Sequence, residues 1–212
     1  MGLQKKLSTP AARMLAISAV GVLAGLIIVA GIGLYLSARI KQAAVNKQAD
    51  YAAKDLYASA VTQIDKGDYT QAEFYLKQAL QKDEGQSTYV SQLAVVEYRL
   101  KHYQESVEQY KLLVDQQKDA DFAWNGMGNA YRDWAAQDAA HAADHQAKAE
   151  AAYREAIATN AHYVASYSNL GLLLRDEGKT ADALKLLDQG IAATGSAELS
   201  QVKSSIAGAS KK

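Results

Sequence analysis

Two histidines and two aspartates are the residues whose types and spacing could bind a metal ion. His141 and His145 are four positions apart, with Asp138 and Asp144 beside them. Residues four apart share one face of a helix, so both imidazoles could ligate one ion. However, Ala142 follows His141, where a hydrolytic zinc helix has a Glu as its base. We therefore expect this Ala-rich stretch to be a solvated helical extension without a metal.

The rest of the sequence does not predict catalysis or cofactor binding. The chain has no Cys, which excludes thiolate nucleophiles, disulfides and zinc–thiolate sites. Gly126 and Gly128 lack the third Gly of a dinucleotide-binding loop. No Ser, His and Asp residues have the local context of a catalytic triad. We predict that the protein is not an enzyme and holds no cofactor.

Charge is balanced over the whole chain but uneven along it. The 212 residues include 23 Lys and Arg and 23 Asp and Glu. Residues 1–50 carry six basic side chains and one acidic one, whereas residues 51–212 carry 17 basic and 22 acidic ones. Binding of nucleic acid needs a clustered basic surface. The acidic main part of the chain therefore predicts no nucleic-acid partner.

An uncharged stretch near the N-terminus predicts a transmembrane helix. Residues 14–37 lie between Arg13 and Arg39 and carry no charge. A helix of ~23 residues is ~34 Å long, enough to cross a hydrocarbon core of ~30 Å. A cleaved signal peptide is the alternative, but its apolar region is usually only about 7–15 residues long. Gly21 and Gly25 form a Gly-x-x-x-Gly pair, which favours pairing of two membrane helices.

The charges that flank this helix bear on its orientation. Residues 1–13 form a basic tail, and Arg39 begins a second basic group after the helix. The positive-inside count is a tie, but a short basic tail before a first helix usually stays in the cytoplasm. We expect a single-pass protein, in a bacterial inner membrane, with its C-terminal domain on the non-cytoplasmic side.

The rest of the chain contains a repeat of 34 residues. Leu56, Val90, Trp124 and Tyr167 occupy equivalent places, separated by 34, 34 and 43 residues, so the last interval contains an insertion of nine. Three further sets of residues recur in the same register. The small residues of the first helices are Ala60, Ala94, Gly128 and Gly171, and those that open the second helices are Ala72, Ser106, Ala149 and Ala183. Their bulky partners are Leu76, Tyr110, Tyr153 and Leu187. With a single Pro and abundant Ala and Leu, the composition favours an all-α fold.

This pattern resembles the tetratricopeptide repeat, a helix–turn–helix unit of 34 residues. The resemblance is plainest at residues 67–72, 123–131 and 167–190. It implies an α-solenoid of about four units over residues 51–195, in which small residues let the paired helices approach closely. Lys101 departs from the pattern, since it replaces the Gly of the turn in unit two.

Three further segments complete the predicted organisation. Residues 38–50 lack Gly and Pro, and we expect a juxtamembrane helix leading into the first repeat. The insertion in unit three is also rich in Ala, so it should lengthen both helices into an extended hairpin, with Trp134 packed against Tyr153 or a position near it. Residues 196–212 are expected to form a capping helix and tail.

By the same resemblance, the first helices of the repeats line a concave face that binds proteins or peptides. The inward positions are the fifth, ninth and twelfth of each unit. They are apolar with two tyrosines in the first half, and mostly Asn and Arg in the second: Tyr57, Val61, Ile64, Ser91, Val95, Tyr98, Asn125, Asn129, Arg132, Ser168, Leu172 and Arg175. We expect the aromatic residues to anchor an apolar stretch, and the polar ones to bind main-chain groups or a carboxylate.

Together these features favour a membrane-anchored interaction scaffold or assembly factor that performs no chemistry. Its partners would be proteins or peptides bound on the concave face. The alternative is a permanent accessory subunit of a larger membrane complex.

Overall fold

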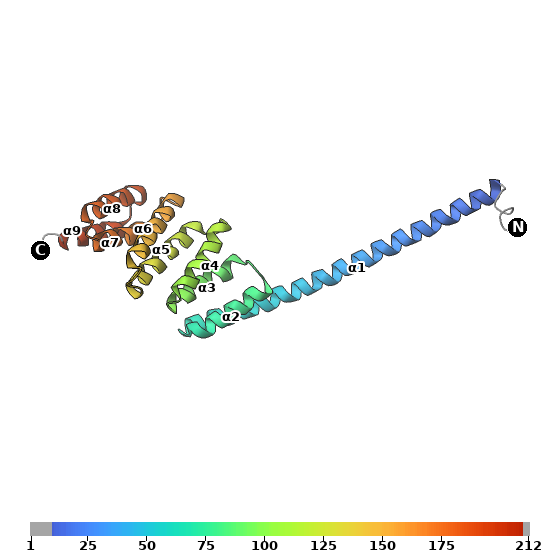
Figure 1. Cartoon of the computed structure of the whole chain (residues 1–212), viewed down its shortest axis with the longest axis horizontal. Helices are drawn as coiled ribbons and strands as arrows, with labels where there is room; N and C mark the ends of the chain where they lie inside the picture. Colours follow the sequence, from blue (N-terminus) through green and yellow to red (C-terminus); the bar gives the residue numbers. More distant parts are fainter. Residues whose placement is uncertain (1–9, 210–212) are drawn as a thin grey trace. The chain divides into compact units, whose positions relative to one another are not determined.

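The computed structural model describes residues 10–209, with the side chains of residue 28 and residues 30–208. The described residues form helices and no strand. In chain order the helices are α1 (Pro10–Asp65), α2 (Tyr69–Lys82), α3 (Ser87–Arg99), α4 (Tyr103–Asp115), α5 (Ala120–Gln137), α6 (Ala142–Thr159), α7 (Val164–Asp176), α8 (Thr180–Thr194) and α9 (Ala197–Ala209) (Figure 1). The chain divides into two compact units, Met1–Tyr51 and Ala52–Lys212.

The described part of the first unit belongs to α1, and residues 38–50 are helical within it. Several apolar side chains there are exposed: Ile28, Ile32, Leu34, Tyr35, Leu36 and Ile40. Among the described residues, no helix is both long enough and apolar enough to cross a membrane. Much of the predicted span 14–37, including Gly21 and Gly25, lies outside the residues whose side chains are described, and so do residues 1–9 of the basic tail.

The second unit is a series of helical hairpins. Helices α3 and α4 pair with each other, as do α5 with α6 and α7 with α8, and each hairpin contacts the next (Figure 1). This arrangement confirms the predicted all-α solenoid.

Small residues allow close helix packing at the repeated positions. Gly128 and Gly126 show the reason, because a Cβ at either position would overlap a ring, that of Tyr153 or of Tyr110 respectively. In unit two, Ser106 takes the place of the small apolar residue, and its buried Oγ donates a hydrogen bond to the carbonyl of Ala94 at 2.8 Å. All twelve predicted packing residues are buried.

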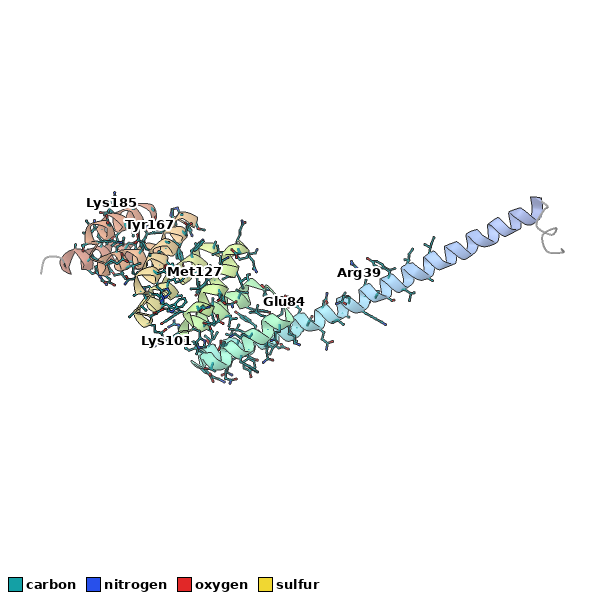
Figure 2. All side chains as sticks on the ribbon, viewed as in Figure 1. Arg39, Glu84, Lys101, Met127, Tyr167 and Lys185 are labelled. Carbon is teal, nitrogen blue, oxygen red and sulfur yellow. The ribbon has the colours of Figure 1, made fainter. Side chains whose placement is uncertain are left out.

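The hydrophobic core continues from hairpin to hairpin. Buried residues of α3 to α6 form a central cluster, which includes Met127, and buried residues of α6 to α9 form a C-terminal cluster, which includes Tyr167 (Figure 2). Tyr131 packs against both clusters, and Leu80 joins the central cluster to those nearer α1. Such continuity is what a repeat array needs, since one hairpin alone cannot bury its apolar face.

Three turns between paired helices share one backbone geometry. Gly67, Lys101 and Gly178 have φ values of 76°, 64° and 77°. In each case the next residue's N–H donates to a carbonyl five residues earlier, for example His102 to Glu97 at 2.9 Å. This is a C-terminal helix cap in which one residue is left-handed. Lys101 therefore adopts the conformation of the Gly that it replaces.

The third hairpin is longer than its neighbours. Helices α5 and α6 have 18 residues each, whereas α3 and α4 have 13 each. The turn between α5 and α6 occupies residues 138–141, so the insertion lengthens both helices, as expected. The expected partner of Trp134 was wrong: its ring stacks on His145, with centroids 4.2 Å apart, while Tyr153 fills the space beside Gly128. In an antiparallel hairpin, a residue nearer the tip on one helix meets a residue nearer the tip on the other.

The last helix covers the end of the array. Leu199 and Ile206 of α9 are buried, and α9 packs on α7 and α8. The Ser196 Oγ accepts a hydrogen bond from the N–H of Leu199 at 3.4 Å, as a helix N-cap does.

Candidate functional site

The twelve predicted groove residues lie on α1, α3, α5 and α7, the first helices of the successive repeats. We call the surface that these twelve residues form the first-helix face. Helix α5 contacts both α3 and α7, so this face is continuous over the last three repeats. Ten of the twelve residues are half-buried, and Asn125 and Ser168 are buried, at 7% and 8% exposure.

The apolar half of the first-helix face contributes largely to the core. The Tyr57 ring stacks on Tyr89 of α3, with centroids 4.9 Å apart. Ile64 packs against the cluster around Leu76, and Val95 against the central cluster. These residues join neighbouring repeats, and only part of each side chain is left for a ligand.

A hydrogen-bonded chain links α3 to α5 at the centre of this face. The Tyr98 hydroxyl donates to Asp133 Oδ2 at 2.5 Å, and Arg132 Nε donates to Asp133 Oδ1 at 2.8 Å. Burial, together with the hydrogen bond to the carboxylate, raises the pKa of Tyr98 to about 12. Tyr98 is therefore a neutral donor, and Asp133, which the sequence pattern did not single out, orients both neighbours.

The asparagines of α5 are held by residues of α6 and α7. The Tyr153 hydroxyl of α6 donates to Asn129 Oδ1 at 2.8 Å. Asn125 Oδ1 accepts from Asn169 Nδ2 at 3.0 Å and from Ser166 Oγ at 3.2 Å, both on α7. Burial raises the pKa of Tyr153, so its hydroxyl also remains a donor.

The last repeat reproduces part of this arrangement. Arg175 occupies the place equivalent to Arg132, and it too binds the carboxylate of the next residue: its Nε lies 2.8 Å from Asp176 Oδ1. Leu172 is half-buried and packs against the C-terminal cluster.

Solved structures with the same architecture come from several proteins. A thermophilic TPR protein, TTC0263 of Thermus thermophilus, matches with a TM-score of 0.59 and 19% identity over 73% of this chain and 81% of its own. MamA matches with a TM-score of 0.56 and 20% identity over 72% and 84% of the two chains. YrrB, described as a TPR protein with an unusual peptide-binding site, matches at 0.52 and 13% over 74% and 76%.

The chain has the tetratricopeptide-repeat fold. No protein-family model matches it, and neither does any curated protein. At these identities the likeness shows the fold alone.

A buried carboxylate in the second repeat was missed by the sequence reasoning. Glu97 is 1% exposed, and its Oε2 has no hydrogen-bond partner among the described residues. Its Oε1 lies 3.5 Å from Lys77 Nζ of α2. Burial raises the pKa of Glu97 to about 7 against the attraction of Lys77. The repeat register held part of the signal, because the equivalent places in units three and four carry Tyr131 and Leu174, although unit one carries Gln63.

The histidines of the extended hairpin are parts of its turn and its packing. His141 Nδ1 lies 2.8 Å from Asp138 Oδ2, and His145 Nε2 lies 3.6 Å from the same oxygen. His145 is 5% exposed, between Trp134 and Tyr131. Within the described range, no three His, Asp or Glu side chains are placed to hold a metal ion.

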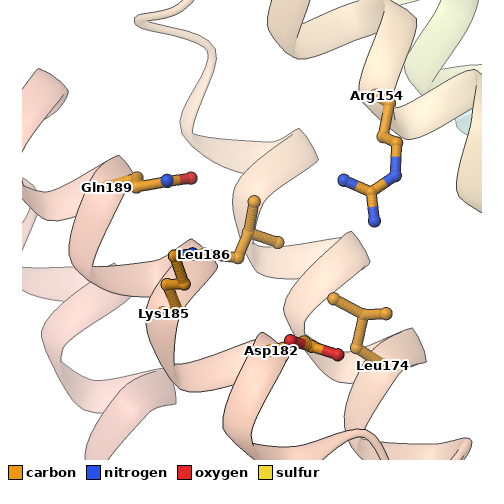
Figure 3. A pocket seen from close by; sticks show the side chains of 6 residues that line it. All are labelled: Arg154, Leu174, Asp182, Lys185, Leu186 and Gln189. Atoms are coloured by element: carbon orange, nitrogen blue, oxygen red, sulfur yellow. The ribbon is translucent and has the colours of Figure 1, made fainter.

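A shallow pocket lies among the later helices, outside the first-helix face. It has a cavity volume of about 320 Å³. Its lining combines charged and apolar side chains of α6, α7 and α8: Arg154, Leu174, Asp182, Lys185, Leu186 and Gln189 (Figure 3).

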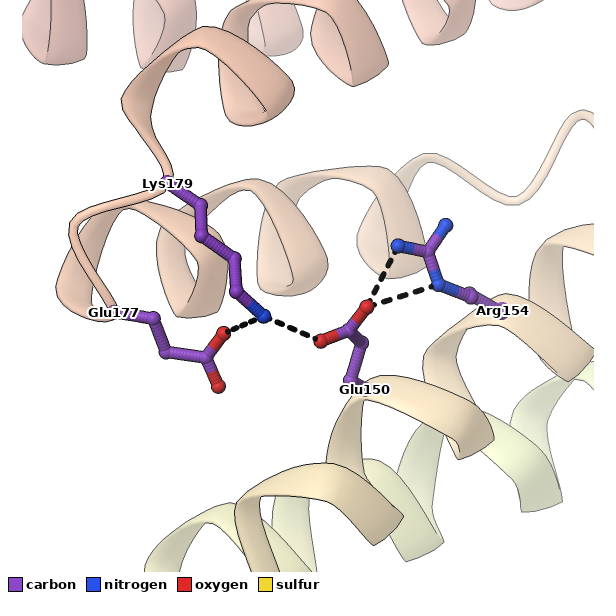
Figure 4. Close-up of polar contacts among 4 residues, drawn as sticks. All are labelled: Glu150, Arg154, Glu177 and Lys179. Carbon is purple, nitrogen blue, oxygen red and sulfur yellow. Dashed lines mark hydrogen bonds and ion pairs between the residues drawn. The ribbon is translucent and has the colours of Figure 1, made fainter. Parts of the chain in front are cut away.

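Arg154 at the edge of this pocket belongs to an ion-pair network. Glu150 accepts hydrogen bonds from Arg154 and, through its other oxygen, lies 3.2 Å from Lys179 Nζ, which also pairs with Glu177 at 2.8 Å (Figure 4). The hydrogen bond from Arg154 is the largest cause that lowers the pKa of Glu150. The network joins α6 to the α7–α8 turn, so its role is structural.

Proposed function

We propose that the protein is a membrane-anchored scaffold or assembly factor that binds a partner protein or peptide on its first-helix face and performs no chemistry. The observation that carries the proposal is the polar centre of that face. There Asp133 and Tyr153 hold Arg132 and Asn129 in place, and both side chains remain partly exposed. Hydrogen-bonding groups fixed before a ligand arrives lower the entropy cost of binding.

Partner capture from the native membrane tests this role. The full-length chain would be purified in mild detergent beside a variant carrying Tyr98→Ala and Arg132→Ala. We expect the variant to lose most of the partner. Because Tyr98 also joins α3 to α5, the thermal unfolding temperature of the variant will fall, and circular dichroism at the capture temperature must show that it is folded. Unchanged capture would place the binding surface elsewhere. A partner that stays in fixed stoichiometry and also contacts the anchor would instead favour the alternative, a permanent accessory subunit of a larger membrane complex.

The anchor in this proposal is the uncharged segment 14–37. Extraction of membranes with alkaline carbonate should leave the full-length chain in the pellet, because ~20 apolar residues insert effectively irreversibly. Recovery of the intact chain in the supernatant would refute the anchor. A chain shortened near Ala38 would support cleavage of a signal peptide instead.

We further propose that the repeat domain lies on the non-cytoplasmic side of a bacterial inner membrane. The short basic tail before the anchor supports this orientation. Protease added to intact spheroplasts should then digest the repeats. Digestion only after lysis would reverse the orientation.

A further inference from the structure

The pocket among α6, α7 and α8 combines an apolar floor with charged walls (Figure 3). Leu174 of α7 and Leu186 of α8 are buried, at 2% and 9% exposure, and form its floor. The charged side chains around them are exposed: Arg154, Asp182 and Lys185. The cavity volume of about 320 Å³ is at the lower end of the range for small-molecule sites. The pocket is therefore large enough for a small ligand.

Arg154 is held in place and still has free donors. Its Nε and one terminal nitrogen, Nη2, both donate to Glu150 Oε1, at 3.2 and 2.7 Å. The other terminal nitrogen, Nη1, makes no hydrogen bond to a described residue. Glu150 is itself fixed by Lys179 of the α7–α8 turn (Figure 4). The guanidinium therefore offers the N–H groups of Nη1 to a ligand from a position that is already ordered.

Lys185 and Asp182 provide one charge of each sign on α8. They are three positions apart on the helix, and in the part of the chain that the structure describes neither makes a hydrogen bond or an ion pair. In Figure 3, Arg154 and Lys185 lie on opposite sides of Leu186, whereas Asp182 lies beside Leu174. Two positive groups from facing helices therefore border the pocket, with a single negative group on another side.

The fold does not require these two positive groups to face each other. In the repeat register, the residues equivalent to Arg154 and Lys185 are Lys111 and Ala151 between α4 and α6. One repeat earlier they are Lys77 and Glu108, which have opposite charges. Facing positive charges therefore occur only between α6 and α8, where they repel each other unless an anion lies between them.

A ligand that satisfies all of these groups carries two charges of opposite sign. A carboxylate suits Arg154 and Lys185, because both are positively charged donors. An ammonium group suits Asp182, whose ionised carboxylate can only accept hydrogen bonds. An apolar side chain would cover the two leucines of the floor. A free α-amino acid carries these three groups in one small molecule.

We propose that this pocket binds a free amino acid with an apolar side chain. The carboxylate lies between Arg154 and Lys185, and the ammonium group lies at Asp182. The inference goes beyond the proposed function, because the pocket is outside the first-helix face and would make the protein responsive to a small molecule.

Ligand-observed NMR on the full-length chain in mild detergent tests the inference. The three probes are leucine, N-acetyl-leucine, which lacks the ammonium group, and leucinamide, which lacks the carboxylate. N-acetyl-leucine resembles the C-terminus of a protein and leucinamide resembles the N-terminus, so the probes also separate a free amino acid from the end of a chain. We expect leucine to bind at least ~tenfold more tightly than either analogue, because each analogue loses a charge-assisted interaction.

Variants of the two unpaired side chains locate the contacts. Lys185→Gln should weaken binding of leucine and N-acetyl-leucine and leave leucinamide unchanged. Asp182→Asn should reduce the affinity for leucine to that for N-acetyl-leucine. The matched controls are Lys111→Gln and Glu105→Gln on α4, at the places equivalent to Arg154 and Asp182, and they should change nothing. Circular dichroism would show that each variant is folded.

Several outcomes would overturn the inference. Leucine could bind no more tightly than either analogue, Lys185→Gln could bind leucine as the wild type does, or leucine could show no saturable binding at millimolar concentration. None of these results bears on the scaffold function, because the Tyr98→Ala, Arg132→Ala variant tests the first-helix face separately. Retained capture of the membrane partner by that variant would refute the scaffold function and leave the amino-acid site standing.

Discussion

Lys101 and Gly178 adopt the same left-handed conformation at equivalent turns, with φ values of 64° and 77°. Each follows the first helix of its repeat, and each N–H donates to a carbonyl three residues earlier, that of Tyr98 or Arg175, at 3.0 and 2.9 Å. A residue with a Cβ is strained there by roughly 1–2 kcal/mol. The turn of the second repeat therefore folds against the preference of its own residue.

Replacing Lys101 by Gly should stabilise the array. The relief of strain exceeds the extra entropy that Gly loses on folding, so we expect a gain of about 0.5–1 kcal/mol. The measurement is chemical unfolding followed by circular dichroism. Gly178→Lys is the reverse substitution at the equivalent turn and serves as the control. No atom crowds a Cβ at that position, so the left-handed backbone alone should make this variant less stable, by a similar amount. Equal stability of all three proteins would contradict the argument.

Glu97 should make stability depend on pH. Its folded pKa of about 7 lies above the ordinary carboxyl value, so the folded chain binds more protons than the unfolded chain between these values. Stability is then lost as pH rises through 7. Glu97→Gln removes the buried charge and should be more stable than the wild type at pH 8, by about 1–3 kcal/mol.

At pH 5 the same substitution should have much less effect, because the carboxyl is then protonated in the folded chain. The matched control is Glu108→Gln, at an exposed site on α4. Thermal unfolding over this pH range is the measurement. An unchanged pH gradient in Glu97→Gln would show that another group titrates.

Gly128 should tolerate a methyl group poorly. Gly128→Ala would press its Cβ into the fully buried ring of Tyr153, and such overpacking usually costs about 1–3 kcal/mol. Gly171 is the equivalent residue one repeat later, where a Cβ would lie 3.1 Å from the Leu187 side chain, which can move more easily. Gly171→Ala should therefore cost less. The order of the two unfolding temperatures checks the prediction, and the reverse order would contradict it.

His145 should be replaceable by Phe with a gain in stability. Both ring nitrogens are buried without a hydrogen-bond partner among the described residues, since Asp138 Oδ2 lies 3.6 Å from Nε2, beyond hydrogen-bond distance, while the ring stacks on Trp134. His145→Phe keeps the stack and removes two unsatisfied polar atoms, so we expect a gain of about 1 kcal/mol. His145→Ala removes the stack as well and should destabilise the hairpin. If Phe were as damaging as Ala, the nitrogens would have a role that the stack does not explain.

The repeat register predicts most of the solenoid, because spacings of 34, 34 and 43 residues fix which side chains face the partner helix. Leu76, Tyr153 and Leu187 are fully buried, as that register requires. The same register identifies a face for the groove but not the depth of each side chain on it. Helix α7 covers most of Asn125. How much it covers depends on the angle between neighbouring repeats, and a local sequence pattern does not predict this angle.

Glu97 and Trp134 show two further limits of the pattern. From the sequence, a carboxylate at a usually apolar position is expected to be exposed. Its burial is evident only when the neighbouring helices are in place. The partner of Trp134 depends on where the turn falls, and a shift of a few residues along a helix changes which ring it meets.

The hydrogen bond from Tyr98 to Asp133 crosses from one repeat to the next, and Asp133 in turn holds Arg132. A solenoid bends by changing the angle between neighbouring repeats, so bending at this joint would shift the guanidinium. The affinity for a partner and the curvature of the array would then be coupled. A force that straightens the array would weaken binding of the partner, and a bound partner would make the array harder to straighten. In a protein held at one end and pulled at the other, elastic extension of the array would then be coupled to release of the partner.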